Sequence, residues 1–166
     1  MKRIVLISSF LFLGMALFAQ GDGKVNTGII QYGQQNYAKA ASLIETGLAL
    51  GVKEKTLPKA HYNLALAYTA MARDSATMAS DPDLLFKAKT AITKTKETDI
   101  KNKFSKNLIL IENGLQISIF NEGAGAYNAG KYAKALPYLE AAAEMNEENL
   151  LYNLLLGYAQ VNLKDL

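Results

Sequence analysis

The chain contains no cysteine and no tryptophan, and His61 is its single histidine. The absence of cysteine excludes a disulfide framework and a thiolate metal site, so stability has to come from packing between elements. One histidine with no ligand or base at a fixed spacing does not make a metal site or an acid–base site. We therefore expect no metal and no cofactor, and we interpret His61 as a surface or half-buried helix residue.

Motifs of catalysis and of nucleotide binding are also missing. Gly123-x-Gly125 follows no strand pattern and lacks the third glycine of the dinucleotide fingerprint. Asp81 and Asp83 flank a proline, which is typical of a helix start. Lysines recur over residues 87–106 with acidic residues between them, which favours a solvated face over an anion-binding stripe. The sequence thus predicts no enzyme and no nucleic-acid partner.

A short basic and apolar leader opens the chain. Lys2 and Arg3 precede an apolar run over residues 4–18, and Ala19 follows as a small residue that suits cleavage. The run is shorter than the roughly 20 residues that a transmembrane helix needs. We predict a signal peptide over residues 1–19, with an uncleaved membrane anchor as the alternative.

The expected mature chain, residues 20–166, is nearly neutral. The full chain has a net charge of +3, from 18 basic and 15 acidic residues. Loss of the two basic leader residues leaves 16 against 15, a net charge of +1, so no strong field remains for nucleic acid or acidic lipid. No other apolar run is long enough to span a membrane. We expect one exported domain, in the periplasm or elsewhere in the cell envelope.

The chain repeats itself. Residues 28–40 read GIIQYGQQNYAKA and residues 123–135 read GAGAYNAGKYAKA, with six identical positions that include the tetrapeptide YAKA. Residues 61–68, HYNLALAY, are echoed by residues 151–158, LYNLLLGY. Internal self-similarity is the mark of a repeat architecture, in which each unit is one supersecondary element.

Apolar residues recur at helical spacing along most of the mature chain, and no period-two pattern suggests a strand. Gly51 and Gly130 suit helix ends, and Asn149 suits a helix N-cap. The sequence predicts an all-α fold with a flexible lead at residues 21–23 and a polar insertion at residues 74–80. The predicted helices span residues 24–35, 37–50, 56–73, 81–98, 104–128, 132–143 and 150–163.

These repeats resemble the tetratricopeptide (TPR) family, in which each repeat is two antiparallel helices in about 34 residues. Gly123, Gly157 and Ala135 stand where that family has small residues between the two helices. Residues 130–132, Gly-Lys-Tyr, match its turn, and Gly123 and Gly157 are 34 residues apart. The resemblance covers the mature chain and implies a TPR-like α-solenoid of antiparallel helix hairpins, with about three and a half repeats.

The chain departs from the family in two ways. It has no tryptophan at the aromatic position of the first helices, and equivalent alanines lie further apart than one repeat. Ala40 and Ala88 are separated by 48 residues, and Ala88 and Ala135 by 47. We expect the extra length in loops or in an overlong helix before Gly123, with a separate short helix as the alternative.

In the family, the first helices of the repeats line a concave groove that binds peptides. The resemblance therefore implies a partner surface at five residues, although packing roles stay open for each of them. Tyr37 and Tyr132 match a packing position and are expected in the core. The candidate partner-binding residues are Tyr32, Tyr68, Asn121, Tyr127 and Asn128.

The sequence predicts a non-catalytic protein–protein interaction scaffold of the bacterial cell envelope, which binds a peptide or protein segment. Two alternatives stay open: the adaptor part of a larger envelope enzyme or transport protein, and a helical solute-binding protein. The expected last helix, residues 150–163, has leucines on all sides and no polar outer face. Residues 164–166, Lys-Asp-Leu, resemble the turn before a second helix. We therefore expect a C-terminally truncated repeat domain, or self-association through the last helix.

Overall fold

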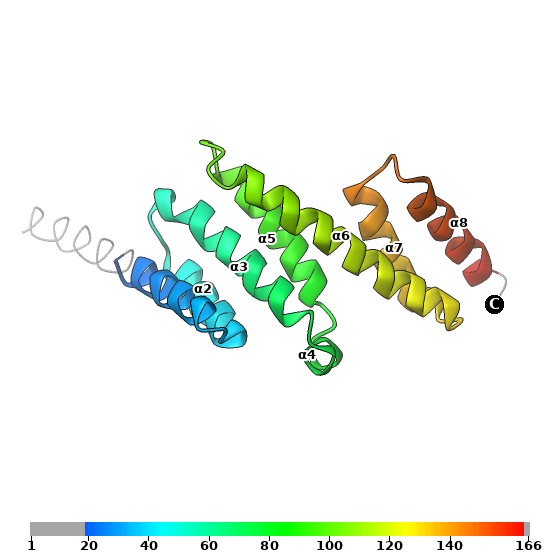
Figure 1. Ribbon diagram of the computed structural model, residues 1–166, viewed down its shortest axis with the longest axis horizontal. Helices are drawn as coiled ribbons and strands as arrows, with labels where there is room; N and C mark the ends of the chain where they lie inside the picture. The colour runs from blue at the N-terminus through cyan, green and yellow to red at the C-terminus, as the bar shows by residue number, and fades with distance from the viewer. Residues whose placement is uncertain (1–18, 165–166) are drawn as a thin grey trace, which may run out of the picture. The chain divides into compact units, whose positions relative to one another are not determined.

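The structure is a computed structural model that describes residues 19–164 (Figure 1). All but the last residue of the leader expected at residues 1–19, and the end of the expected turn, residues 165–166, lie outside the described residues. Within residues 19–164 every regular element is a helix and none is a strand, which confirms the predicted all-α fold.

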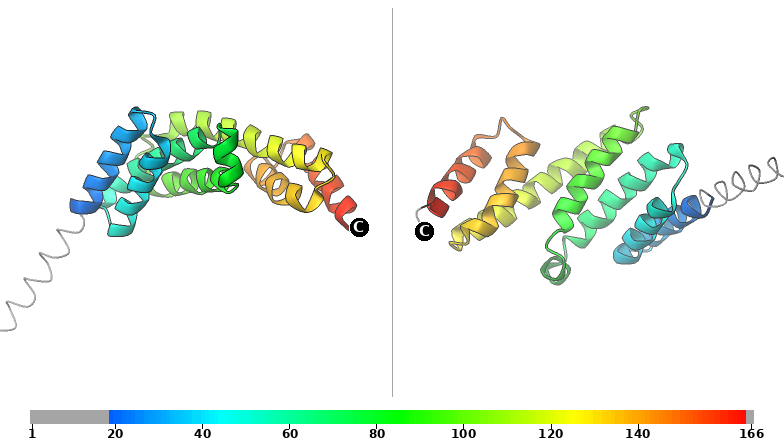
Figure 2. Two further views of the ribbon diagram at one scale, coloured as in Figure 1. Left: turned by 90° about the horizontal axis from the view of Figure 1, so that it is seen from below. Right: turned by 180° about the vertical axis from the view of Figure 1, so that it is seen from behind.

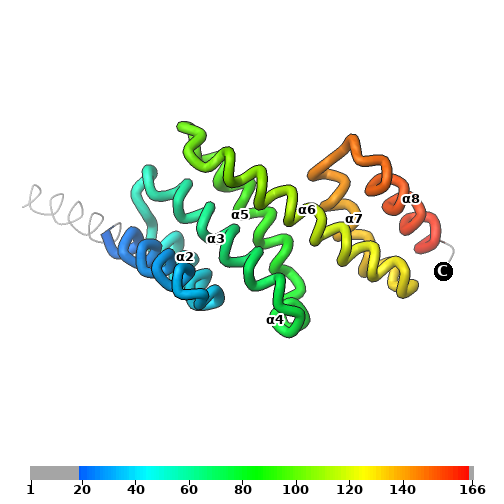
Figure 3. The backbone as a smooth tube through the Cα atoms, in the orientation of Figure 1, coloured from blue at the N-terminus to red at the C-terminus, as the bar shows by residue number. Residues whose placement is uncertain are grey.

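The helices follow one another through short connections, which can be traced in Figure 2 and Figure 3. The chain forms two compact units, one ending at Ile109 and one beginning at Leu110, so the division falls within α6. The first described helix has residues 19–33 and is called helix 19–33 below. The other elements are α2 (Tyr37–Leu50), η1 (Glu54–Thr56), α3 (Leu57–Met71), α4 (Ser75–Ser80), α5 (Leu84–Thr98), α6 (Ser105–Asn128), α7 (Tyr132–Met145) and α8 (Leu150–Lys164).

Helix 19–33 packs closely on α2 through glycines. A Cβ atom on Gly21 would lie 1.9 Å from the carbonyl oxygen of Gly51, and one on Gly28 would lie 2.6 Å from Ile44 Cγ1. These distances leave no room for a side chain unless the two helices move apart. The predicted flexible lead at residues 21–23 is wrong, because these residues are helical and Gly21 is buried.

In the same unit, α3 packs against both α2 and α5. Ile44 of α2, Ala65 of α3 and Leu84 of α5 have no exposed surface. Full burial of a large aliphatic side chain contributes roughly 1.5–3 kcal/mol, so this shared core is what holds the three helices together.

The polar insertion predicted at residues 74–80 is largely a short helix, α4. Asp74 caps this helix, since its Oδ1 accepts a hydrogen bond from the amide of Thr77 at 2.8 Å. The next helix, α5, begins after Asp83 and not at Asp81. The predicted helix-start role of Asp81 is wrong, because its carboxylate pairs with Lys87 Nζ at 2.6 Å instead.

In the second unit, α7 packs against α8. With 24 residues α6 is a single long helix, which confirms the overlong helix that the repeat spacing predicted. Asn149 caps α8 as expected, because its Oδ1 accepts from the amides of Leu151 at 3.1 Å and Tyr152 at 3.3 Å. The core of this unit contains Ala126, Ala135, Leu139 and Ala159.

The two segments with repeated sequence form the same helix–turn–helix hairpin. Their second helices, α2 and α7, have 14 residues each. At the turn, the amide of Gln35 donates to the carbonyl of Tyr32 at 2.9 Å, and the amide of Gly130 donates to the carbonyl of Tyr127 at 2.9 Å. Gln35 and Gly130 both have positive φ. The repetition in sequence thus extends to the backbone of the turn.

Of the three glycines within α6, one lies at a helix contact. A Cβ atom on Gly123 would lie 2.9 Å from Leu139 Cδ2 of α7. Nothing lies within 4 Å of a Cβ placed on Gly114 or Gly125. The expected small-residue contact at Gly123 is confirmed, and Gly114 and Gly125 make no such contact.

Candidate functional site

Two of the predicted site residues, Tyr32 and Tyr127, occupy equivalent places in the repeated hairpins. The ring of Tyr32 lies 5.4 Å from that of Tyr37, and the ring of Tyr127 lies 5.4 Å from that of Tyr132. All four rings are half-buried, so Tyr37 and Tyr132 are less enclosed than the core positions that the sequence predicted. Burial raises the pKa of Tyr32 above its ordinary value. In each hairpin the two rings come from the helices on either side of the turn, and part of each ring is exposed to solvent.

The predicted site residues of α6 lie on two sides of that helix. Asn121 and Asn128 are exposed, and a separation of seven residues places them about 20° apart around the helix axis. Tyr127 is turned about 100° away from Asn128. Its hydroxyl accepts a hydrogen bond from Asn162 Nδ2 of α8 at 3.3 Å. Asn121 and Asn128 are thus placed to share a partner, whereas Tyr127 contributes to the contact between α6 and α8.

Tyr68 lies in the interior of the first unit. Its exposed fraction is 6%, and its hydroxyl donates a hydrogen bond to the carboxylate of Glu45 on α2. Burial, with this hydrogen bond as the second cause, raises the pKa of Tyr68 well above its ordinary value. Because almost none of the ring can reach a partner, we assign Tyr68 to packing and leave it out of the proposed binding surface.

Exposed apolar side chains line one side of α8. The opposite side is covered, since Ala159 is fully buried and the ring of Tyr152 stacks on Phe120 at 4.5 Å. The bare side chains recur at spacings of three and four residues and fall within a stripe about 100° wide. The sequence placed leucines on all sides of this helix, and the structure shows which side is uncovered. We define the α8 surface as Leu150, Leu151, Leu154, Tyr158 and Val161, which are 51–84% exposed.

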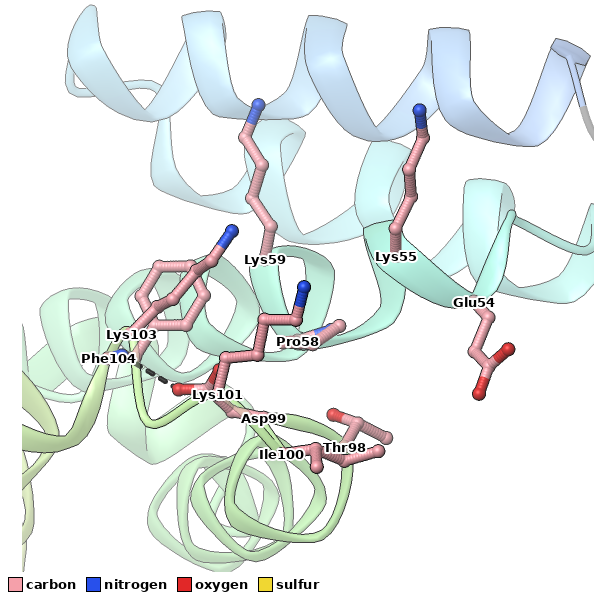
Figure 4. A pocket seen from close by; sticks show the side chains of 10 residues that line it. All are labelled: Glu54, Lys55, Pro58, Lys59, Thr98, Asp99, Ile100, Lys101, Lys103 and Phe104. Atoms are coloured by element: carbon pink, nitrogen blue, oxygen red, sulfur yellow. Dashed lines mark hydrogen bonds between the residues drawn. The ribbon is translucent and has the colours of Figure 1, made fainter.

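A pocket of about 390 Å³ opens in the first unit, where η1 and the start of α3 face the connection between α5 and α6. Figure 4 shows four lysine side chains around it, Lys55 and Lys59 from one segment and Lys101 and Lys103 from the other. The sequence predicted a solvated face for the second pair. No single stretch of sequence predicts the pocket, because its two walls come from segments far apart in the chain.

This lysine-lined pocket has an excess of positive charge. One of its carboxylates, Asp99, is buried and accepts a hydrogen bond from the amide of Phe104 at 2.7 Å. This bond holds the carboxylate against the backbone just before α6. Among the lysines, Lys59 donates to Asn26 Oδ1 at 3.1 Å. The pocket is suited to attract a small anion or an acidic side chain through charge.

His61 is half-buried in α3. Burial lowers its pKa, and the positive charge of Lys94 lowers the pKa further, while Glu97 acts in the opposite direction. Within residues 19–164, no three side chains of the metal-binding types are grouped around a common point. None of the helices described there combines the length and the apolar character that a membrane crossing requires.

No protein-family model matches this chain, and no curated protein matches its sequence. Function is therefore inferred from the repeated hairpins and from the surfaces described above. The tyrosine pairs, the α8 surface and the lysine-lined pocket are the features that a function has to explain.

Proposed function

We propose that the protein is a non-catalytic interaction scaffold of the cell envelope, built from TPR-like helical hairpins, which binds a segment of a partner protein. The repeated turn and the repeated tyrosine pairs support this architecture. The hairpins would be helix 19–33 with α2, α3 with α5, and α6 with α7, and α8 would be a further half. Solenoids of such hairpins use their extended surfaces to bind partners.

The α8 surface is the observation that carries this proposal. Single exposed apolar residues are common on soluble proteins, whereas a contiguous apolar stripe marks an interaction site. Covering such a stripe gains about 25 cal/mol for each Å² of apolar area removed from water. A stripe of this width on one helix suits contact with another amphipathic helix, a common mode of peptide recognition.

The two alternatives remain open and use different features. As the adaptor part of a larger envelope enzyme or transport protein, the chain would use the α8 surface to contact another part of that assembly. As a helical solute-binding protein, it would use the lysine-lined pocket. The four lysines restrict that second alternative to small anionic solutes.

Site-specific cross-linking tests the scaffold proposal. A photo-reactive amino acid at Leu154, within the α8 surface, should yield a covalent adduct with one partner protein in cells that export the chain. Ile30 of helix 19–33 is the matched control, because it is also well exposed at 60%. The control position should yield no such adduct. The absence of an adduct at Leu154, or equal adducts at both positions, would contradict the proposal.

The proposed export is tested separately. Cleavage after Ala19 would give a mature protein that begins at Gln20, without the two basic residues of the leader. Mass spectrometry of the intact protein from an envelope fraction should find that mass. A protein that still begins at Met1 and remains in the membrane fraction would support the uncleaved anchor instead.

A further inference from the structure

We infer that the lysine-lined pocket binds a small organic dianion that carries its charge at one end, such as the phosphate monoester of a short apolar alcohol. The volume of the pocket, about 390 Å³, falls within the roughly 300–1,000 Å³ that small-molecule sites occupy. The inference goes beyond the scaffold function, which uses the α8 surface, and does not depend on it. For the alternative of a helical solute-binding protein, it names the class of solute.

The charges that line the pocket do not cancel. Four lysines and two carboxylates, those of Glu54 and Asp99, leave an excess of two positive charges. Asp99 accepts a hydrogen bond from the amide of Phe104. Figure 4 shows the carboxylate of Glu54 pointing away from the four ammonium groups. A ligand with two negative charges would balance this excess.

None of the four pocket lysines pairs with a carboxylate of residues 19–164. Elsewhere in that range, Lys53, Lys87 and Lys94 each pair with an acidic side chain, at 2.6–3.7 Å. In the pocket, Lys59 donates to the neutral side chain of Asn26. Like charges gathered in a partly enclosed site raise the local potential, and an anion from solution lowers it again.

The two walls of the pocket are held together by contacts of their own. The ring of Phe104, just before α6, stacks on that of Tyr62 of α3 at 4.6 Å. The amide of Phe104 donates to Asp99 Oδ2 at 2.7 Å, and the amide of Asn102 donates to the carbonyl of Asp99 at 2.9 Å. Because these contacts fix the segment that carries two of the lysines, an anion can bind there at a small cost in conformational entropy.

The pocket has a charged side and an apolar side. In the view of Figure 4, the four ammonium groups lie on the side of helix 19–33, and Ile100 lies on the opposite side. Ile100 is 83% exposed, and the half-buried Pro58 and Phe104 also line the pocket. A ligand whose charged group lies among the lysines can therefore cover the isoleucine with an apolar body.

A phosphate monoester combines these two properties. Its phosphate carries about two negative charges near pH 7 and has three acceptor oxygens. Ammonium groups bind phosphate as point charges, so lysines from both walls can share one phosphate without the fixed geometry of an arginine fork. A single carboxylate would leave half of the excess charge unbalanced.

Phenyl phosphate is a suitable probe, and benzenesulfonate is its matched control, because it joins the same ring to a singly charged group of similar shape. In an NMR titration of the mature chain near neutral pH, phenyl phosphate should shift amide signals of residues 54–59 and 98–104, the two walls, in a saturable way. Benzenesulfonate should bind about tenfold more weakly, because it carries half the charge. Inorganic phosphate should bind about threefold or more weakly, because it has no apolar body.

On the protein side, Lys101→Gln combined with Lys103→Gln should weaken the binding of phenyl phosphate by about tenfold or more. Lys39→Gln combined with Lys106→Gln is the matched control, since it removes the same charge from exposed positions of the same unit that do not line the pocket. The control should bind phenyl phosphate as the unaltered chain does. Circular dichroism should show the same helical content in both double variants.

Two single variants test the charged and the apolar side separately. Glu54→Gln increases the excess of positive charge and should strengthen the binding of phenyl phosphate by about two- to fivefold. Ile100→Ser should weaken it by about threefold or more and leave the binding of inorganic phosphate unchanged, because only the ring reaches the isoleucine. Both residues are exposed, so neither variant should alter the fold.

A phosphate monoester can reach the pocket as a soluble molecule or as the headgroup of a lipid. Sedimentation with phosphatidylcholine vesicles, with and without phosphatidic acid, distinguishes these two sources. Cosedimentation that requires phosphatidic acid and that phenyl phosphate displaces would identify a lipid. Binding of phenyl phosphate without such cosedimentation would identify a soluble ester, and both results agree with the inference.

Four results would overturn the inference. Two concern the probes: no saturable shifts in the two walls, or equal binding of phenyl phosphate and benzenesulfonate. Two concern the variants: an equal loss of binding in both lysine double variants, or unchanged binding of phenyl phosphate to Ile100→Ser. None of these results bears on the scaffold function, which the cross-linking at Leu154 tests by itself.

Discussion

Gln35 and Gly130 hold the same position in two copies of one turn, with φ angles of 63° and 71°. The next residue makes the same hydrogen bond in both copies. The amide of Asn36 donates to the carbonyl of Gln31 at 3.0 Å, and the amide of Lys131 donates to the carbonyl of Ala126 at 2.9 Å. This is the Schellman arrangement that closes many helices, and it favours glycine at the residue with positive φ. One copy has that glycine and the other does not.

Because this position holds glutamine in one copy of the turn and glycine in the other, exchanging the residue type should change the free energy of unfolding. A left-handed conformation costs a residue with a Cβ atom roughly 1–2 kcal/mol, and glycine avoids most of that cost. Gln35→Gly should therefore raise the free energy of unfolding by about 0.5–1 kcal/mol, since glycine also gains freedom in the unfolded chain. Gly130→Gln should lower it by a similar amount. Urea unfolding of each variant measures both effects.

Gln34→Gly is the control for this prediction. Gln34 precedes Gln35 at the end of the same helix and has an ordinary negative φ. Glycine there should leave stability unchanged or lower it by up to about 1 kcal/mol. If both glutamine-to-glycine variants change stability by the same amount, the conformation of Gln35 is not the cause.

Gly123 and Gly125 should respond to alanine with opposite signs, although they lie two residues apart in α6. At Gly123 the new Cβ atom would meet Leu139 at 2.9 Å and Tyr138 Cβ at 3.1 Å, and both of these side chains are buried. Gly123→Ala should lower the free energy of unfolding by about 1–3 kcal/mol. Gly125→Ala meets nothing and should raise it by about 0.5–1 kcal/mol through helix propensity. Thermal melts with the same sign for both variants would contradict the contact between α6 and α7.

Element positions were predictable from the sequence because their signals are local. Gly51 ends α2 with a φ of 87°, and Asn149 caps α8 through its side chain, as residue type and spacing indicated. The small residues at Gly123 and Ala135 were predictable as helix contacts because the internal repeat shows the same pattern twice. The all-α fold follows from these local signals alone.

Contacts between distant residues were not predictable in the same way. Gly21 looked like part of a flexible lead, whereas it is helical and buried against the backbone of Gly47 and Gly51, residues 26 and 30 positions away. The lysine-lined pocket joins two segments, and the interior position of Tyr68 depends on Glu45 of the preceding helix. Each of these outcomes depends on tertiary packing, which overrides local preference.

Ala135 should not accept a larger side chain. It has no exposed surface and lies in the core of the second unit with Leu139. Ala135→Leu should overpack this core and lower the free energy of unfolding by about 1–3 kcal/mol. Ala133→Leu is the control, because Ala133 is exposed on the same helix and should change stability by no more than about 0.5 kcal/mol. A melt of Ala135→Leu that matches that of the control would count against the hairpin packing.

Protonation of His61 should destabilise the fold. Burial and the positive charge of Lys94 on α5 hold the pKa of His61 below its ordinary value of 6.5, although Glu97 partly opposes them. In the unfolded chain the imidazole recovers that ordinary value, so the unfolded state takes up the proton first as pH falls. The stabilisation is therefore fully present above the unfolded pKa and is lost as pH falls from about 7.5 to 5.5. Aspartate and glutamate side chains ordinarily titrate near pH 4, so His61, the single histidine, dominates this window.

The urea midpoint should accordingly fall between pH 7.5 and pH 5.5 in the unaltered chain. His61→Gln keeps a polar side chain of similar size and has no group that titrates in this range, so its midpoint should stay flat over the same window. Lys94→Gln should reduce the slope without abolishing it, because burial is the larger cause of the shift in pKa and the lysine is the smaller one. A slope in His61→Gln equal to that of the unaltered chain would show that another group titrates on folding, and that His61 does not sense pH through its contact with α5.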